Sequence, residues 1–189
     1  LQVFCQELAK FENLHSLKLG FYWEVPERQI ELLSISLRAL LRQSLQSVEF
    51  FFDRRLPSFV SPLCEALEDE GRNVRVLRFS AKEFCEADNM SLCRAFSKMP
   101  PLCDVSVMDW SEGALQHLIE TLRTPRVVPF RRFHLRLALN PAEHWAETLV
   151  NSLKGHRIVE LDLQTYMKTF PQHLLEELAN ECGWLEQVM

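Results

Sequence analysis

The hydrophobic positions of this sequence repeat along the whole chain. A pattern of apolar-x-x-apolar-x-apolar occurs six times, and its starts are separated by 31, 29, 28, 28 and 28 residues. The apolar positions are Leu14, Leu17, Leu19; Leu45, Val48, Phe50; Val74, Leu77, Phe79; Leu102, Val105, Val107; Phe130, Phe133, Leu135; and Ile158, Leu161, Leu163. A fixed period of this length indicates one supersecondary unit that is repeated along the chain.

The first half of each unit has the spacing of a β-strand. The last two apolar positions of the pattern lie two residues apart, which places them on the same face of a pleated strand. This register predicts strands at residues 16–20, 47–51, 76–80, 104–108, 132–136 and 160–164.

The second half of each unit has helical spacing instead. Apolar residues recur four apart with charges between them, which is typical of a helix that buries one stripe. Such runs occupy residues 37–41, 63–67, 90–96, 118–122, 149–153 and 174–178, with Phe4 and Leu8 showing the same spacing before the first strand. Gly71 and Gly155 each lie shortly before a strand, where we expect left-handed helix caps.

A strand–helix unit of about 28 residues buries its apolar face only against its neighbours, so the units are expected to stack. The pattern resembles the leucine-rich repeat family, in its ribonuclease-inhibitor-like class with an α-helix in each repeat. The resemblance covers Phe4 to about Cys182. It implies an α/β solenoid with a parallel β-sheet on the concave side and α-helices on the convex side. One such domain is expected over residues 1–189, and Leu1 in place of Met indicates a fragment of a longer chain.

One feature departs from the family pattern. Leucine-rich repeats usually carry Asn or Cys three residues after the third apolar position, and here that ladder is absent. The equivalent positions hold Tyr22, Asp53, Lys82, Trp110, Ala138 and Tyr166. We therefore expect the loops after the strands to satisfy their backbone groups in another way.

Composition and charge argue against several classes of function. The chain has 21 Lys and Arg against 26 Asp and Glu, a net charge of -5, whereas nucleic-acid binding relies on an excess of cations. One stretch is rich in arginine and contains Arg123, Arg126, Arg131 and Arg132. It spans a helix end, a turn and a strand start, so we expect these side chains to point in different directions. No glycine-rich phosphate-binding motif and no membrane-spanning apolar run are present. We predict no nucleic-acid partner, no transmembrane segment and no small-molecule substrate.

The nucleophilic and metal-binding residue types give no catalytic pattern. Cys5, Cys64 and Cys93 lie beside the first apolar residue of a helix stripe, where a thiol replaces a small hydrophobe. The remaining cysteines show no zinc-binding spacing, and no nucleophile motif is found. The sequence therefore predicts a protein that is not an enzyme and has no cofactor. Reduced cysteines favour an intracellular compartment.

The candidate binding surface is the concave face of the sheet. Strand side chains alternate, so the residues between the buried positions face outward there. The candidates are Glu49, Phe51, Arg78, Asp104, Met108, Arg132, His134, Arg136, Glu160 and Asp162. Two interpretations remain open: neighbouring strands neutralise one another on a solvated face, or the alternating charges form a strip that binds a specific protein.

Aromatic residues follow the strands and add a second candidate feature. We expect some of them to pack beneath the loops and the others to stand at the rim of the sheet, where they would anchor a partner. They are Phe21, Tyr22, Trp23, Phe51, Phe52, Trp110 and Tyr166. The pattern favours a non-catalytic protein–protein interaction scaffold that acts alone or as a subunit of a larger assembly. The alternative is the recognition or regulatory part of an enzyme system, such as a ubiquitin-ligase substrate receptor, a GTPase regulator or an immune sensor.

Overall fold

The computed structural model describes residues 2–8, 10–22, 25–52, 61–81, 86–99, 101–110, 115–124, 130–137, 143–165, 170–181 and 187–188. Helices and strands alternate along this part of the chain. The helices are α1 (Gln2–Leu8), α2 (Glu27–Gln43), α3 (Ser61–Glu70), the 3-10 turn η1 (Gly71–Asn73), α4 (Glu86–Lys98), α5 (Leu115–Arg123), α6 (Glu143–Leu153) and α7 (Gln172–Glu181). The strands are β1 (Ser16–Phe21), β2 (Ser47–Phe52), β3 (Val76–Ala81), β4 (Asp104–Trp110), β5 (Arg132–Leu137), β6 (Glu160–Thr165) and β7 (Gln187–Val188).

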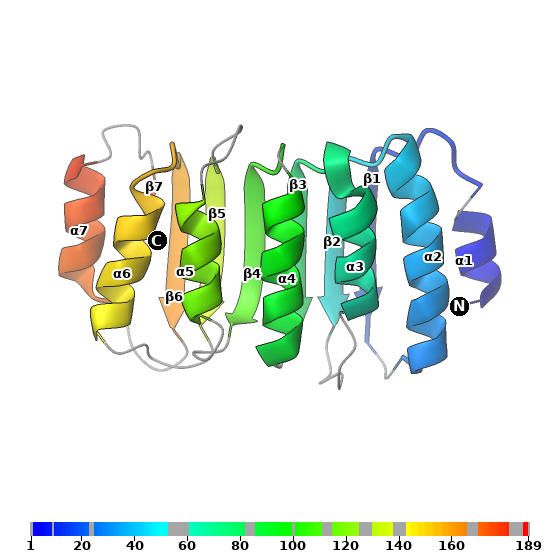
Figure 1. The fold of residues 1–189 in the computed structure, drawn as a ribbon, viewed down its shortest axis with the longest axis horizontal. Coiled ribbons are helices and arrows are strands. Elements are labelled where there is room, and N and C mark those ends of the chain that lie inside the picture. Colours follow the sequence, from blue (N-terminus) through cyan, green and yellow to red (C-terminus); the bar gives the residue numbers. More distant parts are fainter. Residues whose placement is uncertain are drawn as a thin grey trace.

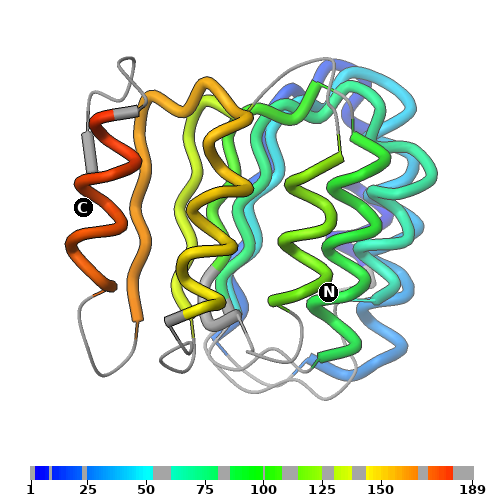
Figure 2. Tube along the Cα trace, turned by 60° about the vertical axis from the view of Figure 1, so that its left-hand side comes forward, coloured from blue at the N-terminus to red at the C-terminus, as the bar shows by residue number. Residues whose placement is uncertain are grey.

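The described strands form one parallel sheet in which each strand pairs with its neighbours in the chain, in the order β1 to β7. The helices lie together on one face of this sheet, so the molecule has two layers (Figures 1 and 2). The α/β class, the parallel sheet and all six predicted strands are confirmed. The short strand β7 was not predicted.

Alternation along each strand separates a buried side from an open side. In β2, Val48, Phe50 and Phe52 are buried beneath the helices, whereas Phe51 between them is 39% exposed. The strand register aligns the buried residues of successive strands into one row, which runs through Leu17, Val48, Leu77, Val105, Phe133 and Leu161. The apolar residues that recur along the sequence thus form the core between the sheet and the helices.

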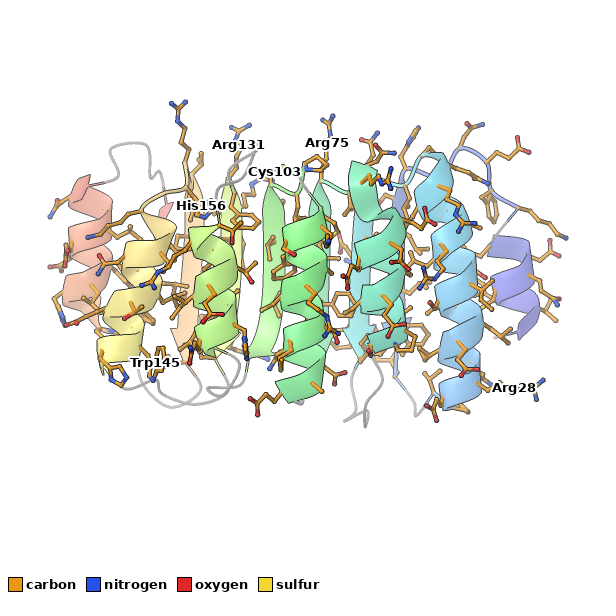
Figure 3. The ribbon with its side chains drawn as sticks, viewed as in Figure 1. Arg28, Arg75, Cys103, Arg131, Trp145 and His156 are labelled. Atoms are coloured by element: carbon orange, nitrogen blue, oxygen red, sulfur yellow. The ribbon has the colours of Figure 1, made fainter. Side chains whose placement is uncertain are left out.

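A ladder of backbone hydrogen bonds, which we call the strand-start ladder, joins the strands where they begin. We call this side of the molecule, where helices end and strands start, the strand-start edge; it is the upper edge in Figures 1 and 3. At each of five junctions, the carbonyl of the residue directly before a strand accepts two N–H groups from the next unit, at 2.7–3.2 Å. The accepting residues are His15, Gln46, Arg75, Cys103 and Arg131. The ladder uses only main-chain atoms, so it restricts the side chains at these positions only by excluding proline, which has no N–H to donate.

The expected glycine caps are wrong. Neither Gly71 nor Gly155 has a left-handed φ. After α3 the chain tightens into η1, and Val74 N–H bonds to the Gly71 carbonyl at 3.0 Å. A Cβ on Gly71 would lie 3.1 Å from Cγ and Sδ of Met99, so this glycine is explained by close packing rather than by backbone conformation.

His156 performs a structural role that the sequence did not signal. Its ring is buried, with Nε2 2.8 Å from the Leu122 carbonyl at the end of α5 and Nδ1 3.5 Å from the Phe130 N–H before β5. The ring also packs on the Phe130 ring, at 4.9 Å between centroids. A neutral imidazole with its proton on Nε2 satisfies both backbone groups, and this side chain joins the segment after α6 to the end of α5 and to the residue before β5 (Figure 3).

Candidate functional site

The face of the sheet without helices, which we call the open face, carries the predicted site residues in ordered rows. The strand register aligns Lys18, Glu49, Arg78, Ser106, His134 and Asp162 across the sheet. A second row contains Ser16, Ser47, Val76, Asp104, Arg132 and Glu160. Phe51 pairs with Gly20 on one side and Ser80 on the other, and Arg136 pairs with Gln164. The backbone of Met108 lies in β4, and its side chain is outside the described residues.

The charged side chains of the two rows form a continuous chain of ion pairs. Positive and negative groups alternate from β1 to β6, and His134 joins this chain when its imidazole is protonated. The distances are Lys18–Glu49 3.1 Å, Glu49–Arg78 3.3 Å, Arg78–Asp104 3.4 Å, Asp104–Arg132 3.5 Å, Arg132–Glu160 3.2 Å, Glu160–His134 3.2 Å and His134–Asp162 3.7 Å. Mutual neutralisation of neighbouring strands, one of the two interpretations of the sequence, is therefore present in the structure.

Asp104 differs from the other members of this ion-pair chain because it is buried. Only 6% of its surface is exposed to solvent, and Arg78 and Arg132 lie on either side of its carboxylate. Both arginines approach Oδ2, and within the described part of the chain Oδ1 has no hydrogen-bond partner. Asp104 therefore positions two arginines, and its own carboxylate is largely covered; its predicted role in binding stays a prediction.

A groove of about 530 Å³ opens beside the ion-pair chain, over the second half of β1, β2 and β3. Tyr22 and Phe51 form its aromatic wall, with their ring centroids 5.6 Å apart. Lys18, Glu49 and Arg78 supply its charges. Small residues line it between these groups, namely Gly20, Ser80 and Ser106. We call this site the open-face groove.

A second hollow of about 320 Å³ continues across the sheet from the open-face groove. Arg78 and Ser106 line both spaces, and Arg132, His134 and Glu160 complete the second. The structure thus gathers six of the ten predicted site residues around two adjoining hollows. Asp104 lies beneath their arginines, and Arg136 and Asp162 lie on the same face outside the residues that line them.

Tyr22 and Gly20 belong to the site although neither was among the ten candidates on the concave face; Tyr22 was expected only among the aromatic residues that follow the strands. Tyr22 follows β1 and is 64% exposed, and its ring folds back over Gly20. A Cβ on Gly20 would lie 3.1 Å from Cε2 and 3.3 Å from Oη of Tyr22, so any other residue would require this ring to shift by a few tenths of an ångström. The sequence signal that could have identified this pair is a glycine two residues before an aromatic residue at the end of β1, the strand that pairs with the strand of Phe51.

The aromatic residues divide between core and rim, as expected. Phe21 and Phe52 are buried and stack at 5.0 Å between ring centroids, whereas Tyr22 and Phe51 stand on the open face. Trp23 and Tyr166 are outside the described residues, and Trp110 is described only by its backbone in β4.

Three of the four described thiols are buried. Cys5, Cys64 and Cys93 are buried in the helix layer, and burial raises the pKa of Cys64 well above its usual value and the pKa of Cys93 to about 12. A protonated, buried thiol is a poor nucleophile. Cys103 is a partly exposed free thiol, while Cys85 and Cys182 are outside the described residues. Among the described residues there is also no group of three or more His, Cys, Asp or Glu side chains arranged to hold a metal ion.

No family model matches this chain. A search of curated proteins also gives no match. The geometry of the open face is therefore the basis for assigning a function. Within the described residues, no helix combines the length and apolar character needed to cross a bilayer.

Proposed function

We propose that this chain is a leucine-rich-repeat-type interaction module that binds a protein partner on the open face of its sheet. Consecutive pairing of parallel strands and a helix layer on one face support the solenoid architecture. The single observation that carries the function is the open-face groove, where two exposed aromatic rings stand beside an arginine. Tyrosine and arginine are enriched among the residues that dominate the energy of protein interfaces, and a neighbouring exposed phenylalanine adds apolar area.

The charges around the groove favour a protein over a uniform polyanion. Every arginine and lysine of the ion-pair chain has a carboxylate within 3.5 Å, so a phosphate backbone would meet anions as often as cations. A protein partner presents both signs of charge and matches such an alternating surface. A recognition part of an enzyme system would use the same face, and the identity of the bound protein decides between these two functions.

The test compares variants of the groove with a matched exposed phenylalanine elsewhere. Phe11 is 57% exposed in the connection between α1 and β1, and it does not line the open-face groove. Tagged wild-type protein, a Tyr22→Ala/Phe51→Ser double variant and a Phe11→Ser variant are used for affinity purification from the native source. Bound proteins are quantified by mass spectrometry.

We expect wild type and Phe11→Ser to retain at least one protein in equal amounts. The double variant should recover about tenfold less of it or lower, because an aromatic hot spot contributes about 2 kcal/mol or more to the binding free energy. Circular dichroism confirms that each variant is folded. Equal recovery with all three proteins would show that the open face is not the binding surface.

A further inference from the structure

A second surface differs from the open face because three of its arginines have no ion-pair partner among the described residues. Arg75 and Arg131 each lie directly before a strand at the strand-start edge, and both side chains point away from the molecule (Figure 3). Arg157 lies in the connection to β6 on the same edge. All three are exposed, and within the described residues none of their side chains forms an ion pair or a hydrogen bond. We call these three residues the basic edge.

The sign of charge along this edge is one-sided, although the whole chain carries -5. From η1 to β6 the described part of this edge also carries Arg72, Lys98, Arg123 and Lys154, of which Lys154 pairs with Glu177 at 2.8 Å. Glu70 borders them as an acidic residue, and it is already bonded to Arg42 at 2.6 Å. The positive potential of the edge is therefore not cancelled locally.

Helix dipoles do not explain the basic edge. Lys98 and Arg123 lie in the last turns of α4 and α5, where a cation is favoured by the helix dipole. The three arginines of the basic edge lie outside the helices, in the segments that lead into β3, β5 and β6. Their backbones take part in the strand-start ladder, or lie close to it, and this fixes where the side chains emerge.

The spacing of the arginines is set by the sheet. Arg75 and Arg131 precede strands that are two positions apart, so their α-carbons lie about 10 Å from each other at about 4.8 Å per strand. A peptide in the polyproline II conformation rises about 3.1 Å per residue with three residues per turn, so carboxylates three residues apart lie on one face at about this distance. In the described parts of these connections no exposed aromatic side chain is available for stacking on nucleic-acid bases.

From these observations we propose that the strand-start edge is a second docking surface, which binds an extended acidic segment of a protein through Arg75, Arg131 and Arg157. Its ligand chemistry is a row of side-chain carboxylates. The binding is independent of the open-face groove, because the groove lies over the second half of the strands. It weakens with salt, as expected for exposed charges.

The test uses the full chain and a fluorescein-labelled peptide of six Glu-Gly-Ser repeats, with fluorescence anisotropy at low salt. A peptide with Gln in place of Glu and a seven-nucleotide oligothymidylate are the comparison probes. Arg75→Glu and Arg131→Glu are each compared with Arg28→Glu. Arg28 is an exposed arginine near the start of α2 on the opposite edge, and within the described residues it has no ion pair (Figure 3).

We expect the Glu peptide to bind and the Gln peptide not to bind. Each edge variant weakens binding of the Glu peptide about fivefold or more, whereas Arg28→Glu, which has the same change in charge, alters it less than about twofold. The Phe51→Ser variant binds the Glu peptide as wild type does. Tighter binding of the oligothymidylate would overturn the proposal in favour of nucleic acid. Equal losses with Arg28→Glu, or no binding of the Glu peptide, would overturn it outright.

Discussion

Two neighbouring phenylalanines on β2 offer a direct test of which face of the sheet is free. Phe52 is 1% exposed and stacks on Phe21 at 5.0 Å and on Phe79 at 6.3 Å between ring centroids. Phe51 is 39% exposed and contacts the Tyr22 ring on the open face. Replacing each by Ala removes the same atoms from opposite sides of one strand, so the difference between the variants reports the environment alone.

The expected magnitudes follow from these exposures. A fully buried Phe→Ala change costs about 3–5 kcal/mol, because the lost transfer free energy is joined by the cost of a cavity. Phe51 keeps about three-fifths of its surface covered, so its loss corresponds to about 1–2 kcal/mol of transfer free energy, and a side chain that borders solvent leaves no closed cavity. Phe52→Ala should therefore be less stable than Phe51→Ala by about 2 kcal/mol.

Urea unfolding followed by circular dichroism measures this difference. The slope of the unfolding free energy against urea should remain unchanged in both variants, because the surface exposed on unfolding is nearly the same. If Phe51→Ala lost as much stability as Phe52→Ala, then Phe51 would be a core residue. The open-face groove would then not exist as a binding surface.

Two further predictions test the core and the thiols. Leu77→Ala should lower the free energy of unfolding, measured in urea, by about 2–5 kcal/mol, since Leu77 is fully buried between Val48 and Val105. Val76→Ala on the open side should lower it by less than about 1 kcal/mol. Similar losses would contradict the strand register. In a short iodoacetamide pulse at pH 8, mapped by mass spectrometry, Cys103 should be alkylated before Cys93, because burial raises the pKa of Cys93 to about 12. Alkylation of Cys93 at the rate of Cys103 would refute this. In the unfolded protein all six cysteines should react without prior reduction.

The strands, the helices and the two faces of the sheet could be predicted because each follows from local spacing. A residue such as Leu161 repeats the position of Leu77 in every respect that burial depends on, so the pattern alone locates the core. Pairing of charges between neighbouring strands followed from the same register. His134 was expected on the open face, and it lies there between Glu160 and Asp162.

The features that escaped prediction depend on contacts between side chains of different units. The burial of Asp104 arises because two arginines from flanking strands close over it, and no local pattern encodes that geometry. It also changes how Arg132 should be used as a probe, because a glutamate in its place would face the buried carboxylate of Asp104. The position of Met99 against Gly71 and the role of His156 have the same origin.

The strand-start ladder also determines how the molecule should respond to mechanical force. Each carbonyl of the ladder holds two N–H groups of the next unit, and each described strand pairs only with its chain neighbours. Pulling the first and last strands apart across the sheet therefore loads these junctions in series, and every junction carries the full force. The bonds at the weakest junction break first, and the next weakest junction breaks once the released segment has been stretched. The fold should lengthen in steps of about one unit of 28 residues, in the manner of a zipper, instead of giving way at once.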